Sequence, residues 1–185
     1  MATISMHFDG DGVVRLMGAT DALAGTRKHA ALRRALNHTG RKCFTRVKRA
    51  LVKQMGLSSQ KIFTGGRSIV QRPASGAHLE FQIVTFGGAI RAKEFRHSVS
   101  RRNGVTFYPW GVRHHFGDAF RVPRFGGNLY RRTTKARFPL EALYGPNLSK
   151  ELVKDASAAA FHQVAAELPR RIAHEITVIT NGVVS

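Results

Sequence analysis

Acidic residues, cysteines and long apolar runs are all scarce in this chain. It holds 11 Asp and Glu against 30 Lys and Arg, a formal net charge of +19 over 185 residues. A single cysteine, Cys43, excludes an internal disulfide and suits a reducing cytosol. No apolar run approaches the roughly 20 residues of a membrane helix, so we expect no membrane partner. The N-terminus also lacks the basic start and apolar stretch of a secretory signal.

The acids are missing from two long stretches. No Asp or Glu occurs over residues 22–79, and Asp118 is the one acid over residues 95–140. So large an excess of positive charge repels itself in a compact monomer, and a polyanion such as DNA or RNA relieves it. The alternative is a solvated basic surface without a partner, although such surfaces usually mix both signs. The composition therefore favours a nucleic-acid partner.

The length and composition fit one folded domain. Apolar residues make up 43% of the chain, which is enough for a core. We divide the chain into an N-terminal arm or short hairpin at residues 1–20 and a single α+β domain at residues 21–185. Within the arm, short strands are expected at residues 3–8 and 13–17, on either side of the turn signal Asp-Gly-Asp-Gly.

A long basic helix is expected after the arm. Asp21 is a candidate N-cap, Gly56 is a candidate C-terminal stop, and Gly40 is a point where the helix bends or splits. Ser58 then caps a short turn of helix. Apolar residues at three- and four-residue steps predict one buried stripe: Leu32, Leu36, Cys43, Val47, Ala50 and Leu51.

The best candidate for contact with a phosphate backbone lies on this helix. Four basic residues recur at seven-residue steps and therefore share one edge: Arg27, Arg34, Arg41 and Lys48. This basic edge is widened by four more: Lys42, Arg46, Arg49 and Lys53. It would give affinity through counterion release rather than base reading. A helix that is merely solvated usually carries Glu–Lys pairs four residues apart, and the local sequence has no acid to form them.

Short strands separated by glycine turns fill the middle of the chain. The strand pattern recurs at residues 78–84, 105–108, 119–122 and 128–131. We expect an antiparallel sheet with basic hairpins, in which Arg131 and Arg132 make a second contact with DNA. The aromatic residues between these strands either stack on bases or fill the core: Phe107, Tyr108 and Trp110.

The C-terminal part is nearly neutral and amphipathic. From Ser149 past Pro169, apolar residues recur at four-residue steps, which predicts a helix that Pro169 kinks or restarts. The apolar, β-branched tail at residues 177–184 either adds a strand to a partner or stays frayed. The expected fold is α+β, with the long basic N-terminal helix and the C-terminal amphipathic helix packed on an antiparallel β-sheet.

Catalytic and metal-binding signatures are poor. His114 and His115 are adjacent, so on a strand they point in opposite directions, and a metal site needs further ligands. His174-Glu175 lacks the second His of a zinc-protease motif. The acids are too few and too scattered for a two-metal nuclease. We therefore expect no enzyme activity, no catalytic residue, no metal and no cofactor.

The segment at residues 137–146 reads Arg-Phe-Pro-Leu-Glu-Ala-Leu-Tyr-Gly-Pro. It resembles the Pro-aliphatic-Glu-x-Leu-Tyr-Gly-Pro signature of phage minor tail protein Z, a family of tail completion proteins in long-tailed phages and prophages. Upstream segments follow in the family's order, although Arg91 stands where its Ile-Pro-Leu-x-x-Phe segment usually has Pro. The resemblance covers residues 22–180. The signature positions are Pro139, Leu140, Glu141, Leu143, Tyr144, Gly145 and Pro146.

The resemblance implies a structural protein of the virion tail, assembled in the host cytoplasm. It would act at the head-proximal end of the tail, in head–tail joining and in passage or positioning of the genome end. The implied partners are the tail terminator and head connector proteins, non-specific double-stranded DNA, and further copies of the chain in a ring. The alternative is a basic nucleic-acid-binding module of the ribosome- or nucleoid-associated type. We expect the signature to form a packed connection, with a turn at Gly145 and with Leu140, Leu143 and Tyr144 against the final helix.

Overall fold

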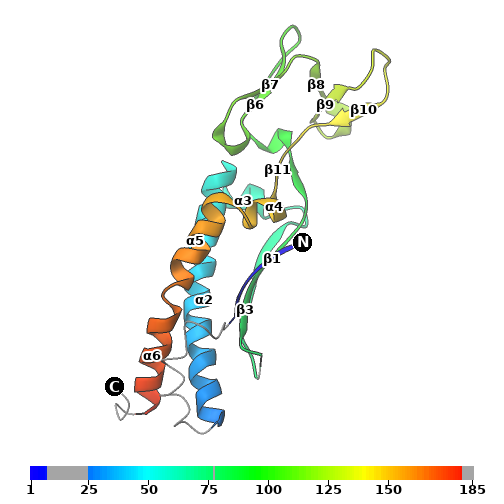
Figure 1. Cartoon of the computed structure of the whole chain (residues 1–185). Helices are drawn as coiled ribbons and strands as arrows, with labels where there is room; N and C mark the ends of the chain where they lie inside the picture. Colours follow the sequence, from blue (N-terminus) through cyan, green and yellow to red (C-terminus); the bar gives the residue numbers. More distant parts are fainter. Residues whose placement is uncertain (8–24, 77, 181–185) are drawn as a thin grey trace.

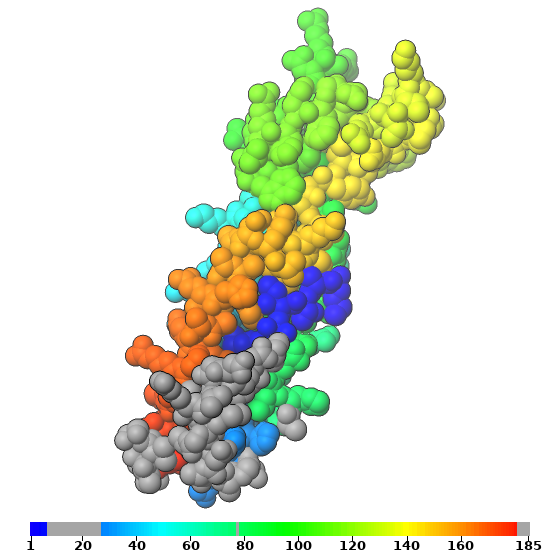
Figure 2. Space-filling model, in the orientation of Figure 1, coloured from blue at the N-terminus to red at the C-terminus, as the bar shows by residue number. Residues whose placement is uncertain are grey.

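One long helix, α2 (Gly25–Met55), joins two parts of an elongated molecule (Figure 1). The computed structural model describes residues 1–7, 25–76 and 78–180. We call the helical part the stem; it comprises residues 1–7, 25–56, 68–86 and 154–180. The strand-rich part at the other end is the head, residues 95–143. Figure 2 shows that the head stands clear of the stem, with its hairpins projecting from the end of the molecule.

The apolar stripe predicted for the long helix is confirmed. Leu36, Cys43 and Val47 are completely buried. Of the bend or split predicted at Gly40, the split does not occur, since α2 is continuous there. A Cβ at Gly40 would lie 2.3 Å from the Phe81 ring, so this glycine lets a strand approach the helix closely. α2 ends where predicted, at Gly56, whose φ of 69° lies in the left-handed region.

The stem contains a three-stranded antiparallel sheet. It consists of β1 (Ala2–His7), β2 (Ser68–Arg72) and β3 (Glu80–Phe86), in the order β1-β3-β2. The strand predicted at residues 3–8 is confirmed over residues 3–7, and it pairs with β3. The strand predicted at residues 13–17, the turn before it and the cap at Asp21 lie outside the described residues.

Three helices replace the single C-terminal helix that the sequence predicts: α4 (Leu148–Leu152), α5 (Asp155–Ala165) and α6 (Leu168–Ile179). Asn147 caps α4, because its Oδ1 accepts hydrogen bonds from two backbone N–H groups at 3.0 and 3.3 Å. The restart at Pro169 is confirmed, since this proline lies in the first turn of α6. Residues 177–179 belong to α6, so the predicted strand or frayed tail is wrong there; residues 181–185 lie outside the described residues.

The head is built from short antiparallel strands. One sheet holds β5 (His97–Ser100), β6 (Gly104–Phe107) and β7 (His114–Phe116); another holds β8 (Ala119–Val122), β9 (Asn128–Arg132) and β10 (Leu140–Ala142). Strands predicted at residues 105–108, 119–122 and 128–131 are confirmed to within one residue. Two 3-10 turns complete this region, η3 (Pro109–Gly111) and η4 (Pro123–Phe125), and a third, η2 (Ala92–Glu94), lies directly before it.

The head meets the stem at a junction of short elements. α3 (Ser59–Ile62) follows α2, and Ser58 is at its N-cap position as predicted, although its side chain makes no capping hydrogen bond. β4 (Ala89–Arg91) pairs with β11 (Tyr144–Asn147) in a two-stranded sheet. The fold class is therefore α+β, as the sequence predicts, and the strands of the described residues are divided among four small sheets. α5 and α6 run along α2, and α4 packs on β1 and β3 (Figure 1).

Two apolar clusters follow one another along α2. The stem cluster includes Leu36 and Phe81, together with residues of α5 and α6. The head cluster includes Phe107 of β6. α2 contributes to both, because Leu51 and Met55 at its C-terminal end belong to the head cluster. The long helix thus fixes the head to the stem and presents its remaining, polar face to solvent along the stem.

Candidate nucleic-acid interface

The basic edge predicted on the long helix lies at the surface of the stem. Arg27, Arg34 and Arg41 are all exposed. None of their guanidinium groups has an ion-pair or hydrogen-bond partner among the residues that the structure describes. These three cations stay on the outside because the opposite stripe of α2 is filled by the stem cluster.

The fourth residue of the basic edge, Lys48, has a different environment. It is half-buried, and its Nζ lies 5.2 Å from the centroid of the Phe63 ring. It lines a hollow of about 520 Å³ whose other lining residues include the apolar side chains of Phe44 and Val52. The cation is therefore held partly by an aromatic ring, and the edge available to a polyanion consists mainly of the three arginines.

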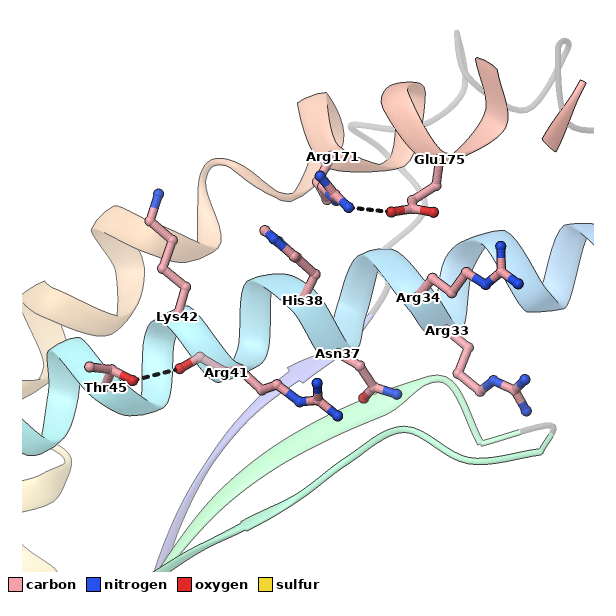
Figure 3. A pocket seen from close by; sticks show the side chains of 9 residues that line it. All are labelled: Arg33, Arg34, Asn37, His38, Arg41, Lys42, Thr45, Arg171 and Glu175. Carbon is pink, nitrogen blue, oxygen red and sulfur yellow. Dashed lines mark hydrogen bonds and ion pairs between the residues drawn. The ribbon is translucent and has the colours of Figure 1, made fainter. Parts of the chain in front are cut away.

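A basic groove continues from this edge toward α6. It has a volume of about 730 Å³ and is shown in Figure 3. His38 and Lys42 point from α2 toward α6, whereas Arg33 and Arg41 point to the other side, where strands of the stem sheet pass. The full lining is Arg33, Arg34, Asn37, His38, Arg41, Lys42, Thr45, Arg171 and Glu175.

A second, smaller hollow of about 310 Å³ adjoins the groove between α2 and α6. Both hollows are lined by His38, Lys42 and Arg171, and the smaller one adds Arg170 and His174. The basic surface therefore extends over two helices. Sequence reasoning missed the α6 contribution, because the C-terminal part is neutral on average and its Arg residues alternate with acids in the sequence.

Two carboxylates reach into this basic surface: Glu167, directly before α6, and Glu175, within it. Lys42 Nζ donates to Glu167 in an ion pair across the two helices. Arg171 pairs with Glu175 one turn further along α6, at 2.5 Å. Lys42, which widens the basic edge, is thus paired with an acid 125 positions away in the sequence, and the absence of local acids could not reveal this partner.

The electrostatic environment of Glu167 reflects these cations. A hydrogen bond from Lys42 and the positive charges of Arg46 and Arg170 hold the pKa of its carboxyl below the usual value. Both partners of the ion pair remain well exposed, at 43% for Lys42 and 52% for Glu167. An ion pair in such a setting contributes little to stability, so Lys42 can exchange this carboxylate for another anion.

Arg131 and Arg132 lie far from the basic edge, in the head. Figure 1 places β9 at the opposite end of the molecule from the N-terminal half of α2. Arg131 Nε donates to Glu141, its cross-strand partner on β10, at 2.7 Å. This contact raises the pKa of Arg131. Arg132 instead lies 5.3 Å from the ring centroid of Phe120. The structure therefore does not bring these two arginines together with the basic edge.

The aromatic residues of the head divide between core and surface. Phe107 is buried in the head cluster, and Tyr108 is half-buried with Arg96 5.3 Å from its ring centroid. Trp110 is 40% exposed and its ring centroid lies 5.8 Å from that of His114. Of the three aromatic residues proposed for base stacking, Trp110 alone presents a large exposed surface.

The signature residues form the path by which the chain returns from the head to the stem. Leu140 and Glu141 belong to β10, where Glu141 pairs with Arg131. Leu143 is 7% exposed and packs in the head cluster with Leu148 of α4. Its backbone N–H donates to the Leu129 carbonyl at 2.8 Å. The first half of the signature therefore fixes the head strands to the junction.

The second half of the signature departs from two expectations. Tyr144 is 51% exposed, so its predicted packing against the final helix is wrong. Gly145 lies within β11, and a Cβ there would come within 2.7 Å of the Phe95 ring. The glycine is needed for this close approach, not for a turn. Pro146 is buried, and Pro139 is exposed.

The described residues offer little for catalysis. No group of three or more His, Cys, Asp or Glu that could hold a metal ion occurs among them. Burial raises the pKa of the Cys43 thiol to about 12, which keeps it protonated and unreactive. His115 Nδ1 lies 3.0 Å from Thr106 Oγ1, while the ring of His114 lies at a tilt beside that of Trp110. Among the residues that the structure describes, no helix is long and apolar enough to cross a membrane.

Comparison with known proteins gives no further guide to the chain. No protein-family model matches it, and neither a curated protein nor a solved structure does. The assignment of function therefore rests on the residues themselves.

Proposed function

We propose that this chain is a non-enzymatic tail completion protein of a long-tailed phage or prophage, and that it contacts the genome at the head-proximal end of the tail. The observation that carries the contact with DNA is a row of three exposed arginines on α2 that have no partner among the described residues: Arg27, Arg34 and Arg41. The position in the tail rests on the resemblance of residues 139–146 to the family signature.

The chemistry of the basic edge suits a phosphate backbone better than bases. The three arginines lie on one side of a rigid helix, at steps of about 10 Å along its axis. Because a genome has to pass through a tail, contacts with it need to be independent of sequence, and phosphate contacts have this property. The absence of acids over residues 22–79 leaves the edge without local neutralisation.

The remaining partners follow from the same proposal. A tail completion protein joins the tail terminator and head connector proteins, and copies of the chain form a ring in the assembled tail. The protein is assembled in the host cytoplasm and stays in the virion. The elongated shape supports this role, because a head remote from the basic edge leaves surface for protein partners while the stem contacts DNA (Figure 1).

The DNA contact is tested by reversing the three arginines to Glu and measuring affinity for a 20-base-pair duplex. Each lost phosphate contact weakens binding about eightfold at 0.1 M salt, so we expect a loss of about 500-fold or more. The matched control reverses three exposed head arginines, Arg101, Arg102 and Arg124. Equal losses in both variants would mean that net charge alone governs binding and that the edge is not the contact.

The place in the tail is tested in the phage. Deleting the gene should give heads and tails that join poorly, or particles that fail to deliver DNA. Purification of the tagged protein from infected cells should recover tail terminator and connector proteins. Fully infectious particles without the protein, or recovery of ribosomes and RNA instead, would replace this proposal with the ribosome- or nucleoid-associated alternative.

A further inference from the structure

We infer that duplex DNA binds along the groove between α2 and α6, not on α2 alone, and that Glu167 limits this binding by holding Lys42. The inference rests on the proposed contact between α2 and DNA, and it adds a second helix and a built-in competitor to it. Neither feature is visible in the sequence, because residues 167–175 hold two arginines and two glutamates and are neutral on average.

The groove carries cations from both helices. Its two hollows share His38, Lys42 and Arg171, so they form one continuous surface. Of the residues that the structure describes, two carboxylates line it, Glu167 and Glu175. The cations among the same residues are Arg33, Arg34, Arg41, Lys42, Arg170 and Arg171. The excess of positive charge therefore comes from the α2 wall, while the α6 wall balances two arginines against two carboxylates.

The length of the groove suits a short stretch of phosphate backbone. From Arg33 to Thr45 the helix rises about 18 Å. One strand of B-DNA presents a phosphate for each 3.4 Å of its axis, or about five phosphates over this length. Flexible Arg and Lys side chains on both walls can reach such a row without reading bases. This geometry favours a duplex backbone over a single small anion.

The two ion pairs in the groove differ in how easily they exchange. Lys42 and Glu167 are 43% and 52% exposed, so a phosphate can replace the carboxylate at little cost. In contrast, Glu175 is only 8% exposed and Arg171 30%, which ties this pair into the packing of α6. Glu167 is therefore the carboxylate that competes with DNA, and Lys42 is the cation that it withholds.

The test compares the salt dependence of duplex binding in three single variants with that of the parent. Glu167→Gln frees Lys42, so we expect affinity to rise about eightfold at 0.1 M salt and the log–log salt slope to steepen by about 0.9. Arg170→Gln removes an α6 cation and should make the slope shallower by about the same amount. Both residues are exposed, so both variants are expected to fold, which circular dichroism checks.

The matched control is Glu141→Gln, which removes the same charge and frees Arg131, but in the head. We expect its slope to equal that of the parent. If Glu167→Gln and Glu141→Gln tighten binding equally, or if Arg170→Gln changes nothing, DNA does not use the α6 wall and this inference is overturned. The proposed contact with α2 would survive that result. It fails separately, if reversing Arg27, Arg34 and Arg41 leaves binding intact.

Discussion

The stem and the head are both basic, but they arrange their charges differently. In the stem, Arg27, Arg34 and Arg41 project from one side of a long helix without a partner among the described residues. In the head, Arg131 pairs with Glu141 and Arg132 lies over an aromatic ring. A rigid helix thus aligns its cations on one open surface, whereas short strands bring a carboxylate opposite Arg131 and an aromatic ring beside Arg132.

The two parts also depend on separate apolar clusters that α2 connects. Phe81 is buried in the stem cluster and Phe107 in the head cluster. Replacing either one with Ala should cost about 3–5 kcal/mol, since a large buried ring is lost. Because Leu51 and Met55 extend α2 into the head cluster, we expect both variants to lower one shared unfolding transition.

Thermal and urea unfolding, followed by far-UV circular dichroism and by Trp110 fluorescence, measure this coupling. The fluorescence reports the head and the helical signal reports the stem. Two separate transitions, one affected by each substitution, would show that the head and the stem are independent folding units.

Hydrogen bonds between polar side chains connect α2 with α4 and α5. Gln54 Nε2 donates to the Glu151 carboxylate at 2.6 Å, and its Oε1 accepts from Ser157 N and Oγ at 3.1 and 3.0 Å. Gln54→Ala leaves these buried groups without that partner and should cost about 1–3 kcal/mol. Gln60→Ala, at an exposed position on α3, should change stability by less than about 0.5 kcal/mol. Similar losses of stability in the two variants would rule out the hydrogen bonds of Gln54 as a source of stability.

A smaller effect is expected from the ion pair between Lys42 and Glu167. Since the pKa of Glu167 is lowered in the folded protein, its contribution is present above the unfolded value of 4.5 and is lost as pH falls below it. Parent and Glu167→Gln should therefore differ slightly in Tm near neutral pH and converge in acid. A difference that persists unchanged at low pH would mean that the carboxylate charge is not its source.

Much of the stem could be predicted from the sequence because its signals are local. The apolar stripe of α2, the stop at Gly56 and the restart at Pro169 each depend on residues close together in the chain. The role of Gly40 could not be predicted in this way. A side chain at Gly40 would collide with the ring of Phe81, which lies on a strand and is 41 positions further along the chain.

The candidate site could likewise be predicted where its signals are local, but not where it depends on contacts between distant residues. Helical periodicity places Arg34 and Arg41 on one edge, and the structure confirms their exposure. The sequence does not say which acid faces Lys42, because the pairing depends on how α6 lies against α2. One local signal was available: Glu167, Arg171 and Glu175 follow at four-residue steps, which places them on one face of a helix. The pairing of Arg131 with Glu141 likewise depends on the register of the β9–β10 hairpin.

The contrast between stem and head is tested most directly by the salt dependence of duplex DNA affinity in two variants. One replaces Arg27, Arg34 and Arg41 with Gln, and the other replaces Arg131 and Arg132 with Gln. The account predicts that the stem variant loses about 2.7 units of log–log slope, while the head variant keeps the slope of the parent. A stem variant with the parent's slope, or a head variant that loses most of it, would contradict the claim that α2 is the surface that contacts DNA.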